Sequence, residues 1–367
     1  MGKFKKLFRK LPDPRADNAR HDLLEILLLA LAAVLCGAES CADMEEFGQA
    51  KEGLLRQILR LEHGVPSHDT FSRVFRLLDP REFERAFRHF VTAFAAFNGL
   101  HLTGIVAVDG KALRGAYERG CSATPLHMVN VFAVEARIAL ASCKAPGRNE
   151  AAGALEVLGM LCLENCVVTA DALHCNRAFA ATVLKRGGDY VLALKKNQSK
   201  LFTAVARRFA RPGARSSAER LDPSTHDRRE RRRATVICDT GLAAASKFPG
   251  IRALARVTSY RRLHGGRADK PLVRYFLLSK YIPAKKLLRI VRGHWGIENQ
   301  LHWLLDVILQ EDANRARKDN APENLAILRC LALNIIRAHP AKASMRRKIK
   351  RAGWEDAFLL SMLAHMR

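Results

Sequence analysis

The chain has 367 residues, more than one ordinary domain holds, and 49% of them are hydrophobic, which is enough for a substantial core. Its 62 lysines and arginines against 36 aspartates and glutamates give a net charge of +26, which favours a polyanionic partner, first of all nucleic acid. The cysteines form no C-x-x-C pair, which argues against a disulfide scaffold and predicts a cytoplasmic, nucleoid-associated protein. The most apolar stretch, residues 23–37, is too short to span a bilayer, so we expect no membrane contact.

The first hundred residues predict a small all-α domain. Residues 1–20 are basic and interrupted by two prolines, which indicates an irregular arm. Helical periodicity then continues to about Phe97. Within it, Ser67 is the expected N-cap of one helix and Asp79-Pro80 begins another.

From Gly104 the sequence changes to an α/β pattern. Residues 105–108 and 167–170 are continuous apolar runs, typical of strands buried on both faces. Two strand-like runs that meet near Glu135 predict a hairpin between them. Helices are expected after Asn149 and Asn176, and a further strand ends before Lys195. This order predicts a sheet with mixed strand directions.

Residues 207–233 are rich in arginine and lack hydrophobic periodicity, which predicts a basic loop. The loop is either simply solvated or a clamp on a DNA backbone, because guanidinium groups pair well with phosphates. Residues 234–282 look like strands of a β-rich insertion with a turn at Gly265-Gly266, and one long helix is expected from about Ala284 to Gln310. The segment beyond His339 is expected to be a basic tail. The candidate phosphate contacts in the basic loop are Arg228, Arg229, Arg231 and Arg232.

Two aspartates stand where the buried strands are expected to stop. Asp109 follows residues 105–108, and Asp171 follows residues 167–170. Ligand sites in open α/β sheets lie at the carboxyl ends of strands, so the two carboxylates meet if their strands are neighbours. Such a pair stays ionised when a cation lies between its members, and oxygen ligands select magnesium or manganese over zinc. A turn residue after a strand is the alternative for either aspartate alone.

Several long segments resemble insertion-sequence transposases of the H-repeat-associated type, which have a ribonuclease-H-like catalytic core. The resemblance covers about residues 11–336. The segments that carry it most specifically are VAVDGKALRGA, VVTADALHCNRAFAATVLKRGGDYVLALKKNQ and HWGIENQLHWLLDVILQEDANRAR. It implies a DDE transposase, in which Asp109, Asp171 and Glu298 are the catalytic and metal-binding acids.

The resemblance also implies the reaction and its partners. The expected cofactor is Mg²⁺, with Mn²⁺ as a possible substitute, and two such ions would serve cleavage at the element ends and strand transfer into target DNA. The partner is double-stranded DNA rather than a small molecule, and pairing two ends implies a homodimer in the synaptic complex. A ribonuclease-H-like nuclease or resolvase without strand transfer is one alternative, and an inactive DNA-binding derivative is another.

Further candidates surround the acids. His294 and His302, four residues on either side of Glu298, are expected on its helix face, where they orient it or touch phosphate. A His-Glu-His zinc site is the weaker alternative. Asp306 is the second choice for the third acid, and Trp295 and Trp303 are expected in the core. The remaining candidate DNA contacts are Lys111, Lys195, Lys196 and Asn197, with a plain surface lysine as the alternative for Lys111.

The expected fold is therefore a ribonuclease-H-like mixed α/β sheet with a β-rich insertion, preceded by a small all-α domain. The first division, residues 1–100, is the helical domain, a candidate for binding DNA ends. The others are residues 101–206, the first part of the catalytic core; 207–283, the basic loop and insertion; and 284–367, the rest of the core and the tail.

Overall fold

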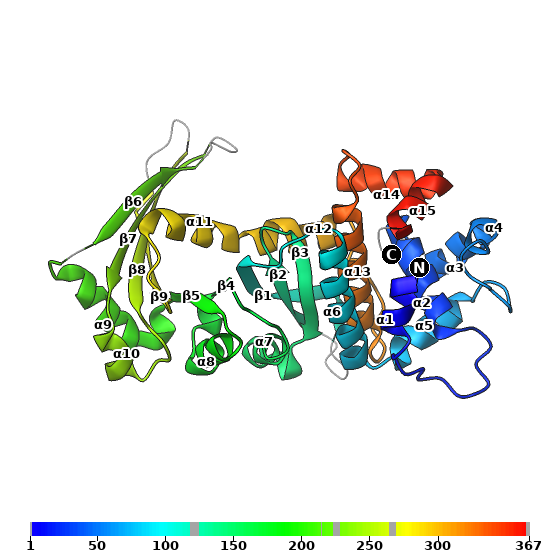
Figure 1. The fold of residues 1–367 in the computed structure, drawn as a ribbon, viewed down its shortest axis with the longest axis horizontal. Helices are drawn as coiled ribbons and strands as arrows, with labels where there is room; N and C mark the ends of the chain where they lie inside the picture. The colour runs from blue at the N-terminus through cyan, green and yellow to red at the C-terminus, as the bar shows by residue number, and fades with distance from the viewer. Residues whose placement is uncertain (1, 118–124, 214, 223–227, 264–268, 365–367) are drawn as a thin grey trace.

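The computed structural model describes residues 2–117, 125–213, 215–222, 228–263 and 269–364. The molecule is elongated, with a helical body at one end and a long sheet that runs from the middle to the other end (Figure 1). Among the described residues the sheet has nine strands in the order β3-β2-β1-β4-β5-β9-β8-β7-β6. The fold is thus mixed α/β with N-terminal helices, as the sequence predicts. No helix of the described ranges combines the length and the apolar composition needed to cross a bilayer.

The helical body joins segments from both ends of the chain (Figure 1). Helices α6 and α13 separate it from the sheet, because both pack against β3. The helices of this body are α1 (Gly2–Phe8), α2 (Leu23–Leu35), α3 (Cys41–Ala50), α4 (Glu52–Leu55), α5 (His68–Leu77), α6 (Pro80–Phe97), α13 (Ala321–Ala338), α14 (Met345–Trp354) and α15 (Asp356–Ala364).

Helix α2 is the centre of this body, and all but one of its residues are buried. Such a helix needs cover on every side. α3, α5, α13, α14 and α15 all pack against it. Its one buried acid, Glu25, is satisfied by the backbone N–H groups of Arg60 and Leu61 at 2.7 and 3.1 Å.

Two terminal segments and one helix cap differ from expectation. The N-terminal arm begins with a helix whose Phe4 and Phe8 are buried and stacked on each other near Phe90. The segment beyond His339 is likewise not a free tail, because α14 and α15 pack on α2. In both cases the apolar residues at helical spacing outweigh the basic composition. Ser67 does take the N-cap position of α5, but its side chain makes no cap hydrogen bond.

Strands β1 to β5 form the half of the sheet that lies next to the helical body, in agreement with the ribonuclease-H-like core that the resemblance implies. β1 pairs antiparallel with β2 and parallel with β4, and β4 pairs parallel with β5. The predicted hairpin is confirmed, since β2 and β3 pair antiparallel around residues 134–137. Asn149 and Asn176 cap α7 and α8 through their side chains, as predicted. The bounds are β1 (Gly104–Tyr117), β2 (Pro125–Ala133), β3 (Ile138–Lys144), α7 (Glu150–Leu158), β4 (Cys166–Ala170), α8 (Arg177–Lys185) and β5 (Asp189–Leu194).

The other half of the sheet, which we call the extension, consists of β6 to β9 and joins the core where β9 pairs antiparallel with β5. The expectation of a basic loop over residues 207–233 is wrong for most of its length. α9 ends within it, β6 lies inside it, and β7 begins in it. The charged residues at the start of β7 are part of a strand, because β7 pairs with β6 on one side and with β8 on the other. The expected turn at Gly265-Gly266 falls outside the described residues. The bounds are α9 (Ser199–Ala210), β6 (Ser216–Leu221), β7 (Arg228–Cys238), α10 (Gly241–Ser246), β8 (Ala253–Leu263) and β9 (Leu272–Leu278).

The predicted long helix after Ala284 is interrupted. α11 (Ala284–His294) is followed by a turn at Trp295, a π-helical segment over Glu298–His302, and α12 (Trp303–Val307). α11 crosses the sheet and packs on β6, β7, β1 and β4. Single π turns often mark functional positions, since they change the direction in which side chains point. Here the π segment begins at the glutamate that the resemblance assigns to the site.

Candidate active site

The register between β1 and β4 brings the two predicted aspartates together. The parallel pairing ends at Val108 opposite Ala170, so Asp109 and Asp171 are the next residues on neighbouring strands. Asp171 follows the end of β4 as predicted. Asp109 does not end its strand, however, because β1 continues to Tyr117 along β2. The pairing of β1 with β4 ends just before Asp109, and the Asp109 carboxylate lines the pocket at this point.

The third acid comes from the helical segment that crosses this edge of the sheet. Glu298 lines a cavity of about 250 Å³ together with Asp109 and Asp171. Thr169, Lys195, Arg274, His294 and Trp295 are also part of its lining. Glu298 is exposed, whereas the side chain of Asp109 is only 22% accessible. The three acids therefore face one pocket from β1, from the end of β4 and from the π segment.

Crowded negative charge changes the ionisation of Asp109. Burial, and after it repulsion by Glu298, Glu150 and Asp171, raise its pKa to about 7 against the opposing effect of the N–H of Gly110. Asp171 behaves differently. Burial alone would raise its pKa, but the N–H of Ala172 and the ammonium of Lys195, 3.0 Å away, outweigh burial and leave the pKa lowered. The pocket thus holds one carboxylate that is easily protonated beside one that stays ionised.

The two histidines do not share one face with Glu298. His294 lines the pocket, and its Nδ1 lies 3.1 Å from the hydroxyl of Thr169. His302 points to the interior instead, where its Nε2 lies 3.3 Å from the amide of Asn130 and its Nδ1 3.9 Å from Asp109. Burial lowers the pKa to about 4 for His294 and about 3 for His302, so both rings are neutral at pH 7. Phosphate contact by His302 is therefore not supported, because the ring is buried.

Lys111 also has a role other than the predicted one. Its side chain is 6% exposed, and its ammonium lies 2.6 Å from Asp306 and 2.5 Å from Glu311. Burial alone would lower its pKa, but these two acids outweigh burial and raise it. The ammonium group of Lys111 is paired with carboxylates of the protein and is buried, so its predicted contact with a DNA phosphate is not supported. Asp306, the second choice for the third acid, is likewise engaged here and does not line the pocket.

The donor set of the pocket suits a hard divalent cation. Carboxylate oxygens are the ligands that magnesium and manganese prefer, and a bound cation would relieve the repulsion that raises the pKa of Asp109. In the part of the chain that the structure describes, no three His, Cys, Asp or Glu side chains stand close enough together to enclose an ion. The acids line the pocket without converging on a single point.

Comparison with known proteins shows the family to which this chain belongs. The model of the transposase DDE domain matches residues 101–335, and the model of the DDE_Tnp_1-associated region matches residues 5–91. The chain belongs to the DDE transposase family. The H repeat-associated Escherichia coli (strain K12) protein YhhI is 30% identical to this transposase over 96% of both chains. YbfL of the same strain is 32% identical, also over 96% of both chains.

Among solved structures, the transposase is similar to the piggyBac transposase in a synaptic complex with hairpin DNA. The alignment covers 98% of this chain and 77% of that chain, with a TM-score of 0.42 and 13% identity. At that distance the likeness carries no argument about residues or partners.

The predicted DNA contacts of the transposase divide into exposed and engaged groups. Lys196 and Asn197 are exposed just past β5, where Asn197 donates a hydrogen bond to the carbonyl of Ala172. Arg231 is exposed and lies over the ring of Tyr260, with its guanidinium 3.2 Å from Glu219. Arg232 is instead buried between Asp222 and Glu230, at 2.7 and 2.8 Å, so its predicted contact with DNA is not supported. The side chains of Arg228 and Arg229 fall outside the described residues.

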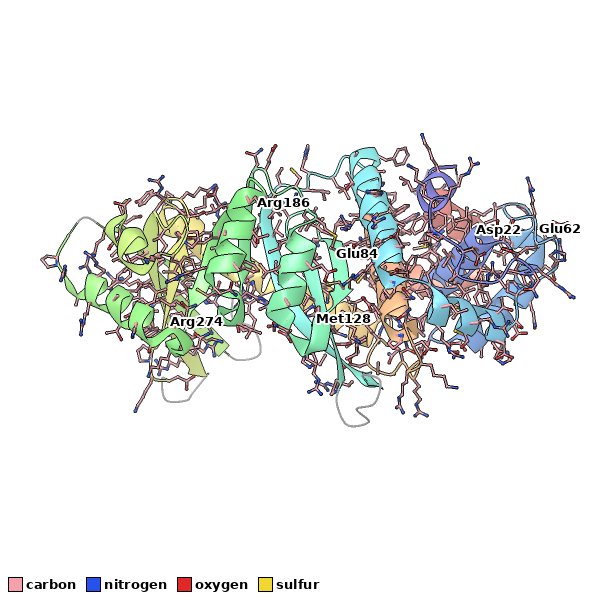
Figure 2. All side chains as sticks on the ribbon, turned by 90° about the horizontal axis from the view of Figure 1, so that it is seen from below. Asp22, Glu62, Glu84, Met128, Arg186 and Arg274 are labelled. Atoms are coloured by element: carbon pink, nitrogen blue, oxygen red, sulfur yellow. The ribbon has the colours of Figure 1, made fainter. Side chains whose placement is uncertain are left out.

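Sequence reasoning also misjudged some neighbours of the site. Arg274, labelled in Figure 2, lies on β9, lines the pocket and was overlooked. The available signal was an arginine inside an apolar strand run. Glu150, at the start of α7, pairs with His127 at 2.8 Å, and a Cβ added at Gly110 would overlap its carboxylate. Nothing in the local sequence links Glu150 to Asp109. Trp303 was expected in the core but is 53% exposed.

Proposed function

We propose that this transposase cleaves DNA at the ends of an insertion sequence and joins the freed ends to target DNA, with Asp109, Asp171 and Glu298 as the acids of one active site. The observation that carries the proposal is the shared pocket. Three acids, separated widely in sequence and carried by three different elements, line one small cavity. A structural role would not require these acids to face the same solvent-accessible space.

The same acids would hold the magnesium or manganese ions that the family implies. When bound, the ions lower the pKa of the attacking hydroxyl and stabilise charge on the phosphorus and on the leaving oxygen. The protein's own contribution is the arrangement of charge. Lys195 keeps Asp171 ionised, and the neutral His294 holds its place against Thr169 without adding a positive charge beside the ions.

Cationic groups around the acids suit a DNA strand that enters the pocket. Lys195 and Arg274 line it, and Lys196 is exposed at its edge. The extension adds the exposed Arg231 and Arg233 on β7. Phosphate contacts from such groups position a duplex without reading its sequence. We propose that the extension holds the DNA whose scissile phosphate occupies the acid pocket.

Pairing of two element ends requires two active sites, so we propose a homodimer during synapsis. This part follows from the reaction and can be tested separately, by sizing the complex formed with a duplex that carries the element end. A complex that contains one protein chain and one duplex under cleavage conditions would contradict it.

The test of the central proposal is an assay of end cleavage and strand transfer with Asp109→Asn, Asp171→Asn and Glu298→Gln. Each change keeps the size of the side chain and removes its charge. We expect each variant to lose at least about a thousandfold in cleavage rate, as is common when a group that binds the transition state is removed. Glu164→Gln is the control, because it removes an exposed acid that lies outside the pocket and precedes β4, whereas Asp171 follows that strand.

The outcomes separate the alternatives. Undiminished cleavage by any of the three variants would remove that residue from the site. Cleavage by the natural chain without joining to target DNA would identify a nuclease or resolvase. Metal-independent binding to element ends without cleavage would identify an inactive derivative.

A further inference from the structure

A buried lysine near the acid pocket, Lys111, has three carboxylates around its single positive charge. Lys111 follows Asp109 by two residues on β1, so the two side chains leave the same face of the strand. Its ammonium contacts Asp306 and Glu311 directly and lies 3.7 Å from Asp312. Glu311 is itself 3% exposed. Burying so much charge is costly, and apolar residues of similar size would pack the same volume at lower cost.

All three partners of Lys111 come from the segment that follows Glu298. Asp306 lies on α12, which continues directly from the π segment that contains Glu298 and His302. Glu311 and Asp312 lie in the turn after α12. The lysine therefore joins the strand of the first acid to the helical segment of the third. An ammonium suits this junction because it offers three donors in different directions.

Neighbouring contacts extend the same junction along β1. The N–H of Arg114 donates to the Asp312 carboxylate at 3.2 Å, and Arg317 donates to the carbonyl of Gly115 at 2.9 Å. A Cβ added at Gly115 would overlap backbone atoms of Asp312 and Asn314, so the two segments approach as closely as a glycine allows. Of the β1 residues in these contacts, Lys111 is the nearest to Asp109 in sequence.

We propose that Lys111 is a positioning residue of the active site, which holds the strand of Asp109 against the helical segment of Glu298 through Asp306 and Glu311. The inference rests on the proposed function of the three acids. Lys111 touches neither DNA nor the reacting atoms. Its effect is to fix the separation of two carboxylates that repel each other, so that they can share a divalent cation.

The test compares Lys111→Met with Lys111→Arg, which keeps the charge, and with Lys196→Met, which removes an exposed lysine near the site. Mn²⁺ binding to the DNA-free protein is measured by calorimetry. Binding of a duplex with the element end is measured in EDTA at several salt concentrations. Because Lys111→Met leaves buried carboxylates unpaired, the triple variant Lys111→Met/Asp306→Asn/Glu311→Gln is included, and thermal melting identifies the folded variants.

Positioning predicts that Lys111→Met and the folded triple variant bind Mn²⁺ at least about tenfold more weakly, as is typical for residues that orient metal ligands. Lys111→Arg should recover part of that loss. DNA affinity in EDTA and its salt dependence should stay unchanged in the Lys111 variants. In Lys196→Met the slope of log affinity against log salt should fall by about one, as expected for one lost phosphate contact.

Two results would overturn the inference. Natural Mn²⁺ affinity in a folded Lys111→Met or triple variant would leave Lys111 a purely structural residue. A reduced salt slope in Lys111→Met would make it a phosphate contact after all. Asp171→Asn serves as the reference: if it loses Mn²⁺ binding while the Lys111 variants do not, only the present inference fails. If Asp171→Asn binds Mn²⁺ with natural affinity, the proposed role of the acids in metal binding is contradicted as well.

Discussion

The two halves of the sheet use charge in opposite ways. In the half formed by β1 to β5, β4 is entirely buried, and Asp109 and Asp171 stand where its pairing with β1 stops. In the extension, arginines lie within the strands themselves, as a nearly continuous run at the start of β7 and at the end of β8. The first half concentrates negative charge at one point, and the second distributes positive charge over a surface. A single sheet thus carries both the acids that we propose to bind metal ions and the arginines that we propose to contact DNA.

The difference follows from what covers each half. α11 packs over the inner part of the extension, where Ala234, Val236 and Val257 form a core with Leu287 and Val291. Beyond that cover, the strands continue toward the hairpin ends (Figure 1), and most arginines of β7 lie in this outer part. Arginines in a strand therefore do not by themselves indicate whether that part of the strand is buried or exposed. Their meaning depends on which residues lie under a helix and which face solvent.

The comparison is tested most strongly at Arg232, because it is a basic residue of the extension that serves structure. Arg232→Ala leaves Asp222 and Glu230 without their main partner in a buried place. We expect a loss of about 3 kcal/mol in the free energy of unfolding, measured by urea denaturation. Arg233→Ala, next along the strand and exposed, should change stability by less than about 0.5 kcal/mol. Equal stability of the two variants would contradict the division into structural and exposed arginines.

The negative half can be tested through pH without metal. The pKa of Asp109 is raised from 3.8 in the unfolded chain to about 7, so its stabilising contribution is present at low pH and lost as pH rises to about 7. In EDTA at pH 8, Asp109→Asn should therefore be more stable than the natural chain by about 2–4 kcal/mol, with the gap closing toward pH 4. Asp171 has a lowered pKa, so Asp171→Asn should be less stable than the natural chain at pH 8. Thermal melting in EDTA at several pH values measures both.

The smallest expected effect concerns DNA binding by the exposed surface. Arg233→Ala should reduce the salt dependence of DNA affinity by about one unit of log–log slope and weaken binding equally for different sequences. Arg232→Ala, compared at a temperature where it remains folded, should leave that slope unchanged. Filter binding or fluorescence anisotropy at graded salt concentrations distinguishes the two.

Local sequence patterns predicted those features that depend on a few adjacent residues. The apolar runs before Asp109 and Asp171 located the buried strands, and these strands are neighbours, which was the condition for the two carboxylates to meet. The side-chain caps at Asn149 and Asn176 also followed from residue type. The arginine-rich hairpin was missed because strand alternation is invisible when the outward and inward residues are both charged. Lys111 was misassigned because its partners lie about two hundred residues away in the chain.

The burial of α2 has a consequence for the order in which the molecule is assembled. This helix leaves the ribosome before α13, α14 and α15, which cover it and are the last described helices to be made. Until they arrive, a thirteen-residue helix of almost entirely apolar side chains has part of its surface uncovered. Such surface is prone to aggregation during synthesis. The sheet is completed before the helical body, so the catalytic half of the chain is complete while the N-terminal helices still await their partners.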